Sequence, residues 1–420
     1  MTVTKVEVCL THQTTTHDIE KERKFSKNAE PKSTDLSSQV ASLARKLDQS
    51  QPVKNILSGL ILLENLGIHF VLKAFFVDMA WTPKLGSTVT VSSLMRTFLL
   101  DKSHKALLHT LLIGVEEFGV LKFNNHSAET LSWTVTRLPP PSSNIQKTIK
   151  LIQTQLLAFP ECSTEAEFLN YTGSNLYSVL RGEVSGLEIL FPPESSPHYK
   201  FGANNLYTNS MLMEHSKTIY IIEGILQTLR AVDPSQEIVK ILEIGAGTGG
   251  TTVPLLSAIS ADPALSSRFE IHYNFSDISN FFVTKAKARL ETLFPKVHFQ
   301  YSILDIEVPQ PIVAGTGFDI IVAADVFHAT QYMDDTLRHT RALVKPGGIL
   351  ILGEIFKSSL FLELSFGMTE GWWRYGDDFR QMDGPLLSEA GWDGVLRKFG
   401  FGHVFTVGHG NYGVVFAKGV

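Results

Sequence analysis

The spacing of apolar residues changes along this chain. From residue 53 to 79 apolar side chains recur every three or four positions, which predicts a long helix, and two amphipathic helices are expected at 89–99 and 106–118. Residues 119–123 and 131–136 then have the pattern of two strands around a polar turn. Three helices followed by a hairpin is the order of elements in a winged helix.

Polar segments separate this region from the rest of the chain. Residues 1–50 are rich in Thr, Ser, Lys and Glu and show little periodicity before Val40, so we interpret them as a linker. Prolines at 139–141 end the predicted hairpin, because consecutive prolines continue neither a helix nor a strand. We therefore expect a mainly helical, winged-helix-like lobe over residues 51–190 and a second domain over residues 191–420.

The second domain alternates strands and helices. Apolar runs predict strands at 239–244, 270–275, 297–302, 319–324 and 349–354, and the helices between them include 280–293 and 334–344. A turn at 345–348 would stop the second of these helices. This alternation predicts a doubly wound parallel α/β sheet. The end of the chain has the pattern of a hairpin, 404–407 and 412–417, which adds an antiparallel strand.

Charge argues against nucleic acid as a partner of the lobe. Charged residues make up 19% of the chain, and the formal net charge is −5. The segment 89–110 carries only Arg96, Lys102 and Lys105 as fixed positive charges, whereas a helix that binds DNA needs a basic footprint. We expect a lobe that packs or shapes a substrate site, and no nucleic-acid partner.

Cysteine usage and hydropathy indicate the compartment. Cys9 and Cys162 stand far apart, with neither metal-ligand spacing nor a disulfide framework, which fits a reducing environment and predicts no metal site. Residues 1–10 lack the long apolar core of a signal peptide, and we expect no stretch of membrane-spanning length. The sequence therefore predicts a soluble cytoplasmic protein with no membrane partner.

The first strand of the second domain ends in Gly245, Gly247 and Gly249. Glycines there let the backbone turn sharply and approach a ligand closely. Glu243 completes an E-x-G-x-G-x-G pattern, which resembles the cofactor-binding signature of S-adenosylmethionine-dependent methyltransferases. Because position 250 is also glycine, spacing alone leaves a dinucleotide-binding loop as an alternative.

Ligands of open α/β sheets bind outside the carboxyl ends of the strands. Asp277 and Ile278 follow the second strand, where a carboxylate can accept both ribose hydroxyls, although Asp277 can equally cap a helix. Asp305 and Ile306 follow the third strand and suit an adenine, with a carboxylate for its amine and aliphatic surface for its ring. A solvated turn explains Asp305 almost as well.

A histidine and a carboxylate fall at the ends of two neighbouring strands. His328 lies four residues past the fourth strand, and Glu354 ends the fifth. Adjacent strands are about 4.8 Å apart, so the two side chains would face each other at one edge of the sheet. A carboxylate beside an imidazole fixes its tautomer and raises its basicity, which suits a general base. The alternative is a buried pair that only holds a loop.

The segment between Phe356 and Gly384 exceeds an ordinary connection. Its aromatic residues suit a lid that excludes water from a site, or equally a cover for the core; they are Phe361, Phe366, Trp372, Trp373 and Tyr375.

Several motifs in order resemble the C-methyltransferase domain of fungal polyketide synthases, and they are residues 242–250, 275–279, 326–330, 345–348 and 370–373. The resemblance covers about residue 191 to the C-terminus. The lobe, through residues 111–119, looks like the non-reducing branch of that family. Asp325 departs from the pattern, because asparagine is expected there more often.

The resemblance implies a Rossmann-like class I methyltransferase sheet with an antiparallel last strand, preceded by the winged-helix-like lobe. The implied reaction transfers a methyl group from S-adenosylmethionine to the α-carbon of a β-ketoacyl thioester, giving S-adenosylhomocysteine. The acyl chain would be carried on the phosphopantetheine arm of an acyl carrier protein. Partners would be that carrier and other domains of the same synthase, and the chemistry needs no metal.

The resemblance also implies roles for individual residues. His328 would take the α-proton, and Glu354 would orient it. Trp372 and Trp373 would face the substrate. From its position before the helix that leads into the first strand, we expect Tyr207 to cap the methyl group of the cofactor or the acyl chain, although it can equally be a packing residue. The cofactor contacts would be Glu243, Gly245, Gly247, Gly249, Asp277, Ile278, Asp305, Ile306 and Asp325.

Two other classes stay open. A small-molecule O-methyltransferase with a winged-helix lobe would also use a histidine base. A non-catalytic scaffold domain would keep the fold and fail to bind S-adenosylmethionine, but the complete glycine loop with Glu243 argues against it.

Overall fold

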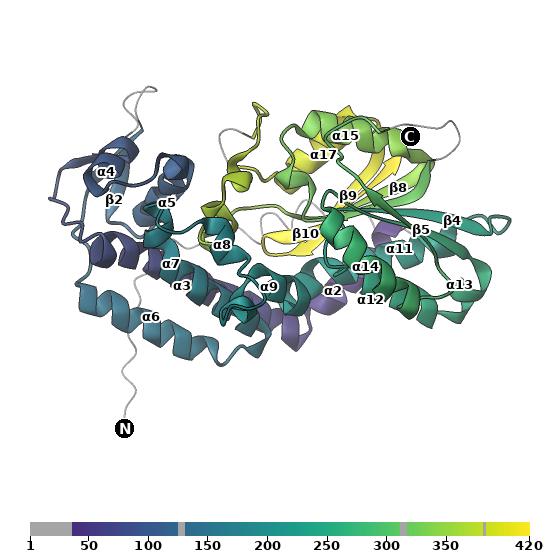
Figure 1. Ribbon diagram of the computed structural model, residues 1–420, viewed down its shortest axis with the longest axis horizontal. Helices are drawn as coiled ribbons and strands as arrows, with labels where there is room; N and C mark the ends of the chain where they lie inside the picture. The colour runs from purple at the N-terminus through teal and green to yellow at the C-terminus, as the bar shows by residue number, and fades with distance from the viewer. Residues whose placement is uncertain (1–35, 125–130, 311–316, 381–383) are drawn as a thin grey trace.

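The computed structural model describes residues 36–124, 131–310, 317–380 and 384–420. A mostly helical lobe and a part built on one large sheet lie side by side along the long axis of the molecule (Figure 1). The main elements of the lobe are α3 (Gln51–Lys73), β1 (Thr88–Thr90), α4 (Val91–Phe98), α5 (Lys105–Glu117), β2 (Leu121–Asn124), β3 (Ser132–Val135), α6 (Ser142–Leu156), α7 (Ser163–Leu180), α8 (Gly186–Leu190), α9 (Ala203–Asn209) and α10 (Met211–Met213).

The winged-helix order predicted for the lobe is present. β2 and β3 pair antiparallel, and β1, which the sequence analysis missed, pairs with β3 on its other side. The indole of Trp133 is fully buried and donates a hydrogen bond to Glu116 on α5, with Nε1 and Oε2 3.1 Å apart. This bond fixes the hairpin on the preceding helix, because a buried indole N–H needs an acceptor.

The Ser50 hydroxyl caps the start of α3 by accepting the Val53 N–H, and α3 continues into a π-helical turn, η2 (Ala74–Asp78). The continuous helix Gln51–Asp78 is long and apolar enough, by length and composition, to cross a membrane. The expectation that no stretch has that length was therefore wrong. Half of its most apolar window is buried inside the protein, where α3 packs against α5, α6 and α7, as the core helix of a lobe does.

The linker predicted over residues 1–50 is wrong for its last part, while residues 1–35 lie outside the described residues. α2 (Leu36–Asp48) is a helix whose Val40 is fully buried against the sheet part of the molecule. It packs on α11 (Ile219–Ala231) and on the last hairpin of the sheet. Polar residues on its outer face hid its narrow apolar stripe from the sequence analysis.

Among the described residues, seven strands form one mixed sheet in the order β6-β5-β4-β7-β8-β10-β9. The first five are parallel, and β10 runs antiparallel to both of its neighbours, as predicted. The strands are β4 (Ile238–Ile244), β5 (Glu270–Asp277), β6 (His298–Ile303), β7 (Phe318–Ala324), β8 (Val344–Ile355), β9 (Phe401–His409) and β10 (Tyr412–Gly419).

Helices cover both faces of this sheet. Residues of α11, α12 (Thr252–Ala261) and α14 (Asn280–Leu293) share one apolar cluster with one face, and α2 joins them. α15 (Met333–Leu343) and α17 (Glu389–Lys398) cover the other face, and α13 (Pro263–Arg268) precedes β5. The predicted stop turn at residues 345–348 is instead part of β8, which starts directly after α15 and has an irregular register with β7 there.

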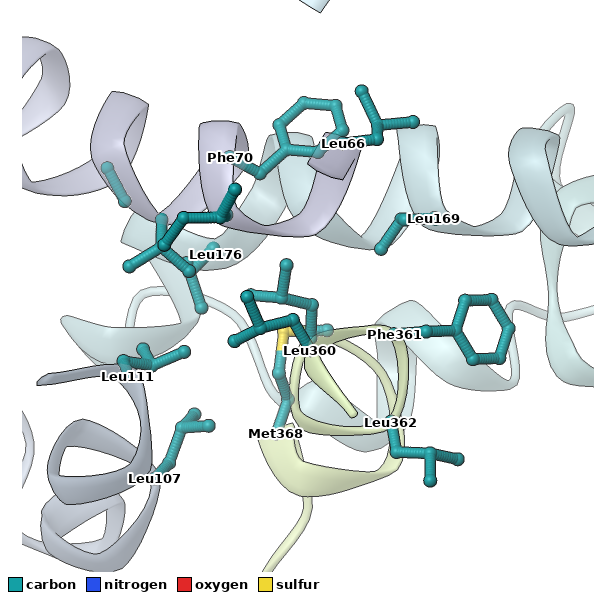
Figure 2. Packing of buried hydrophobic residues seen from close by; sticks show 14 of the residues in the cluster. Leu66, Phe70, Leu107, Leu111, Leu169, Leu176, Leu360, Phe361, Leu362 and Met368 are labelled. Carbon is teal, nitrogen blue, oxygen red and sulfur yellow. The ribbon is translucent and has the colours of Figure 1, made fainter. Parts of the chain in front are cut away.

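The two parts of the molecule share a core. The segment after β8 forms α16 (Leu360–Glu363) and short 3₁₀ turns at Phe366–Met368 and Glu370–Trp373. α16 inserts among helices of the lobe (Figure 2). Leu360 lies so close to α3 and α5 that a Cβ added to Gly67 would be 2.9 Å from the Leu360 Cβ. Glycine is therefore required for this close approach. This segment therefore covers the core, as one of the two alternatives expected.

Candidate active site

The predicted pairing of His328 and Glu354 is present at the carboxyl ends of β7 and β8. His328 Nδ1 is 2.6 Å from Glu354 Oε2, and the backbone N–H of Phe327 donates to Glu354 Oε1 at 3.0 Å. Both side chains are buried. Because the carboxylate accepts from Nδ1, the second ring nitrogen, Nε2, is left as the basic atom.

The surroundings of His328 raise its basicity. Burial by itself would lower the pKa of the imidazole, because it penalises the charged form. The charge and hydrogen bond of Glu354, together with the charge of Asp325, outweigh burial, so the pKa of His328 lies above its usual value. Such a group is a stronger base than free imidazole.

His328 lies on the wall of a cavity of about 250 Å³ at the junction of the two parts of the molecule. Asp325 and His328 line it from the sheet. Glu165, Leu206 and Tyr207 line it from the lobe. The segment after β8 closes it, chiefly with Phe361, Leu362, Phe366 and Trp372. A largely apolar cavity with a few polar groups is the usual form of a small-molecule site.

The structure brings two of the three predicted substrate residues to this cavity. Trp372 and Tyr207 line it, and the Trp372 ring lies edge-on to His328 with ring centroids 5.6 Å apart. Phe366 stacks between them, 6.1 Å from Tyr207 and 6.2 Å from Trp372. Trp373 does not line the cavity, because its indole N–H donates to the Gly367 carbonyl at 2.7 Å and its ring packs on the lobe core.

Asp325, predicted to contact the cofactor, forms an ion pair with Lys217. Lys217 is only 3% exposed and lies on a π-helical turn, η6 (Glu214–Thr218), before α11. Asp325 itself has φ of 57°, and its N–H donates to Gly353 at 2.8 Å. Lys217 thus offsets the charge that distinguishes Asp325 from asparagine. Lys217 was not predicted from the sequence, because no local pattern indicates a π-helical turn.

The glycine loop has the geometry expected of a ligand cradle. Gly245, Gly247 and Gly249 all have positive φ, between 53° and 81°. A Cβ on Gly247 would meet only one backbone oxygen, at 3.9 Å, so the loop is open on that side. Asp277 accepts the Gly247 N–H at 2.9 Å and the Ser279 N–H at 2.8 Å. Asp277 therefore shapes the loop as well as standing at the predicted ribose position.

The Glu243 carboxylate is buried beneath the glycines of the loop. It accepts hydrogen bonds from Thr252 and Tyr273. Burial, which outweighs these bonds, raises its pKa to about 7. The predicted contact between Glu243 and the cofactor stays a prediction; the side chain is 3% exposed and is bonded to Thr252 at the start of α12.

The predicted adenine side of the loop is present in part. Ile278 is 64% exposed at the rim, beside Ile303, which is 60% exposed. Ile306 is buried in the core with α15, so its side chain offers no surface to an adenine. Asp305 accepts the N–H of Glu307 at 2.9 Å, as a turn residue does. Ile303, one of the residues before Asp305, supplies the exposed aliphatic surface that was assigned to Ile306.

Two further contacts place the loop, the base and the lobe together. A Cβ on Gly245 would lie 2.4 Å from a methyl group of Val326, two residues before His328. A Cβ on Gly250 would lie 3.5 Å from the carbonyl oxygen of Tyr207. The glycine loop is therefore adjacent both to the His328 turn and to the helix that carries Tyr207.

One group of possible metal ligands lies away from this site. Glu270, His272 and His298 come together at the amino ends of β5 and β6, on an exposed edge. The sequence analysis did not find this group, since its members are close only across two strands. It lies at the end of the sheet opposite His328.

Comparison with known proteins identifies the class of domain. Residues 242–350 match a family described as a methyltransferase domain. The non-reducing polyketide synthase mapC of Penicillium roqueforti is 33% identical over 243 residues, which are 58% of this chain and 9% of that protein. The corresponding synthase ausA of Penicillium brasilianum is 36% identical over 261 residues, 62% of this chain and 10% of that protein.

Solved structures extend the likeness to the lobe. The CurJ carbon methyltransferase is 28% identical with a TM-score of 0.75, and the match covers 92% of this chain and 98% of that one. Residues 242–350 form a methyltransferase domain, and nearly the whole chain is similar to carbon methyltransferase domains of polyketide synthases. The citrinin polyketide synthase CMeT domain, at 19% identity and a TM-score of 0.69, has the same fold over 90% of this chain and 97% of its own.

The comparisons confirm the predicted class I methyltransferase fold and the use of S-adenosylmethionine by this methyltransferase domain. The domain spans about a tenth of the length of the synthases that it matches, which are 9% and 10% covered. Its fit to the cofactor rests on the open, positive-φ glycine loop, on Asp277 beside it and on the exposed Ile278 at its rim.

Proposed function

We propose that this domain methylates the α-carbon of a β-ketoacyl thioester carried on an acyl carrier protein, within a larger cytoplasmic synthase. The observation that carries the proposal is the buried His328–Glu354 pair on the wall of an apolar cavity next to the glycine loop. A proton between two carbonyl groups is acidic enough for an imidazole base. A cavity walled by leucine and aromatic side chains suits an acyl chain.

His328 and Glu354 divide the work of proton removal. Nε2 of His328 takes the α-proton, and Glu354 holds Nδ1–H and stabilises the imidazolium that forms. Glu354 is itself held by the Phe327 N–H, so the pair is fixed before substrate binds. Fixed groups need no reorganisation during reaction, which is where much of their effect arises.

The second role is stabilisation of the enolate oxygen. The Trp372 indole N–H is buried and has no acceptor among the described residues, and its ring is the neighbour of His328. We assign this N–H to the substrate carbonyl on which negative charge develops, since a donor preset there lowers the barrier.

Residues of the glycine loop would hold the cofactor. Bound S-adenosylmethionine supplies an electrophilic methyl group. Gly247 and its neighbours present open backbone to it, Asp277 stands at the ribose position, and Ile278 with Ile303 offers aliphatic surface. The proximity of Gly245 to Val326 brings this loop next to His328, as alignment of two reactants requires.

Mass spectrometry of an acyl carrier protein loaded with a β-ketoacyl chain tests the proposal. With S-adenosylmethionine and the domain, the chain should gain one methyl group on carbon. Simple acyl chains without the β-carbonyl should gain none, because their α-proton is too weakly acidic for an imidazole. Methylation of phenols with no reaction of β-ketoacyl chains would support the O-methyltransferase alternative. Failure to bind S-adenosylhomocysteine would support the scaffold alternative.

A further inference from the structure

The lobe side of the cavity carries a buried polar group that the mechanism above does not use. Glu165, on α7, lines the cavity and has an exposed fraction of 0%. Its Oε1 accepts a hydrogen bond from the Ser210 hydroxyl. Its Oε2 is buried and makes no hydrogen bond of good geometry among the residues that the structure describes, although the backbone N–H groups of Leu212 and of Glu165 itself lie close to the carboxyl group. A buried acceptor without such a bond is costly, so its presence on a cavity wall points to a ligand.

Ser210 is fixed in this arrangement. Its hydroxyl oxygen accepts the Met213 N–H at 2.9 Å, as the cap of α10, so its own proton is directed to Glu165. The lining near Glu165 includes Leu206, Leu212 and Tyr207 of the lobe, and Tyr412 of β10, whose pKa is raised by burial and by the charge of Glu165. Burial raises the pKa of Glu165. No basic side chain forms an ion pair with it in the part of the chain that the structure describes.

We propose that Glu165, oriented by Ser210, is a subsite for an O–H group on the acyl chain beyond the β-carbon, either a hydroxyl or an enolised ketone. The inference rests on the proposed function, because it takes the cavity as the acyl site. Glu165 comes from the lobe and His328 from the sheet part, so the subsite and the reacting carbon are at cavity walls formed by different parts of the molecule.

An O–H donor suits this position in either protonation state of Glu165. A carboxylate oxygen accepts from it, and a neutral carboxyl group can still accept. An unsubstituted chain would leave Oε2 without a hydrogen bond of good geometry, whereas an oxygenated chain would supply one. Sites built to bind a hydroxyl group reject analogues that lack it. The domain would therefore select chains by their oxygenation as well as by length.

The test uses β-ketoacyl thioesters of one chain length, with a hydroxyl group placed at successive carbons beyond the β-position, and the unsubstituted chain as reference. A matching series with a ketone at the same carbons distinguishes the two sources of the O–H group. For the parent protein, at least one oxygenated chain should have a kcat/KM roughly tenfold or more above the reference.

Variants connect that preference to Glu165. Glu165→Met should abolish it, while Glu165→Gln, which keeps an accepting oxygen, should retain part of it. Glu161→Met is a matched control: Glu161 also has a buried carboxylate oxygen without a partner among the described residues, but its other oxygen accepts from Asn55 at 2.8 Å and it does not line the cavity. That control should keep the preference of the parent.

The ratio of two substrates within one protein does not depend on how much of a variant folds. Binding of S-adenosylhomocysteine identifies the folded fraction of each variant. Equal kcat/KM for oxygenated and unsubstituted chains in the parent would overturn the subsite, as would a preference that survives in Glu165→Met. If the parent methylates every β-ketoacyl chain equally, the proposed function stands and the subsite alone fails. If it methylates none, both fail.

Discussion

Burial and pairing act in opposite directions on the His328 imidazole, and the paired carboxylate prevails. The raised pKa follows from Glu354 first and Asp325 second, against the penalty of burial. Asp325 is itself held by Lys217, which moderates its effect on the imidazole. The basicity of the residue that takes the proton thus depends on the charges of three side chains that never touch the reacting carbon.

The pH profile of Glu354→Gln is the first prediction. In the parent, His328 is a base only above its raised pKa, so kcat/KM falls as the pH drops through that value. Without the charge of Glu354, burial dominates and the pKa of His328 falls, so this acid limb should move to lower pH. The maximal rate should also fall, by up to the roughly 10²–10⁴-fold expected for His328→Ala, because the imidazolium loses its partner.

The matched control for that profile is Glu389→Gln, an exposed carboxylate that bonds Thr406 far from the cavity. The acid limb of its pH profile and its maximal rate should equal those of the parent. An acid limb that stays in place in Glu354→Gln would show that another group titrates in the reaction.

Glu243→Gln is the second prediction. The pKa of Glu243 is about 7 in the folded protein, against an ordinary 4.5, so the folded state holds a proton that the unfolded state releases. Stability should therefore decrease as the pH rises from about 4.5 to about 7, by about 3 kcal/mol from this group. Glutamine keeps the bonds to Thr252 and Tyr273 and removes the titration.

Urea unfolding of Glu243→Gln and parent across that pH range measures the difference. The free energy of unfolding of the variant should increase relative to that of the parent as the pH rises. Its affinity for S-adenosylhomocysteine should be close to that of the parent. A large loss of affinity with an unchanged pH dependence would place Glu243 on the ligand after all.

At the scale of elements, the docking of α16 in the lobe depends on the space that two lobe glycines leave for it. It docks where Gly67 on α3 and Gly114 on α5 leave room for Leu360. The neighbouring Phe361 and Leu362 reach the cavity wall. The position of the wall therefore depends on the absence of two side chains.

Gly67→Ala is the third prediction. Alanine favours a helix by about 1 kcal/mol over glycine, but its Cβ would lie 2.9 Å from the Leu360 Cβ. We expect a net destabilisation of about 1–3 kcal/mol, as for overpacked cores, and a lower methylation rate. Gly394→Ala is the matched control, because Gly394 also lies in a helix and has nothing within 4 Å of an added Cβ. It should be neutral or stabilising; equal effects of the two changes on unfolding would contradict the clash.

The elements that the sequence predicted well are those defined by local periodicity. The helix expected at 280–293 is α14 with the same bounds, and the strand ends that carry His328 and Glu354 fell at one edge as expected. What it missed depends on distant parts of the chain. The apolar stripe of α2 can be recognised only from its packing against α11. Lys217 is buried because a π-helical turn directs its side chain to Asp325. No sequence pattern pointed to Glu165, because its possible role depends on a cavity formed by three segments of the chain.

At the scale of the whole molecule, the lobe and the sheet part share a hydrophobic core. The lobe core contains residues of α16 and of the turns after it, and Tyr412 of β10 joins them. Interfaces of this kind couple the unfolding of the parts they join.

Coincident unfolding is the fourth prediction. Trp133 is buried in the lobe, and Trp392 is buried in the core beneath the sheet. Two variants, in which either Trp133 or Trp392 is the single remaining tryptophan of the five, therefore report on each part separately. After correction for the stability of each variant by circular dichroism, both fluorescence transitions should share the midpoint of the backbone signal in urea. A lobe transition well separated from the sheet transition would show that the shared core does not couple them.

The position of β10 also determines when, during synthesis of the chain, the sheet can be completed. β8, whose last residue but one is Glu354, pairs with β7 on one side and with β10 on the other, where Gly413 lies opposite Glu354. A ribosome makes β10 more than fifty residues after β8. Until then, the strand behind the catalytic pair has an open edge that any extended peptide could occupy. A nascent chain paused before residue 412 should therefore depend on chaperones, and it should have no methyltransferase activity until β10 is inserted.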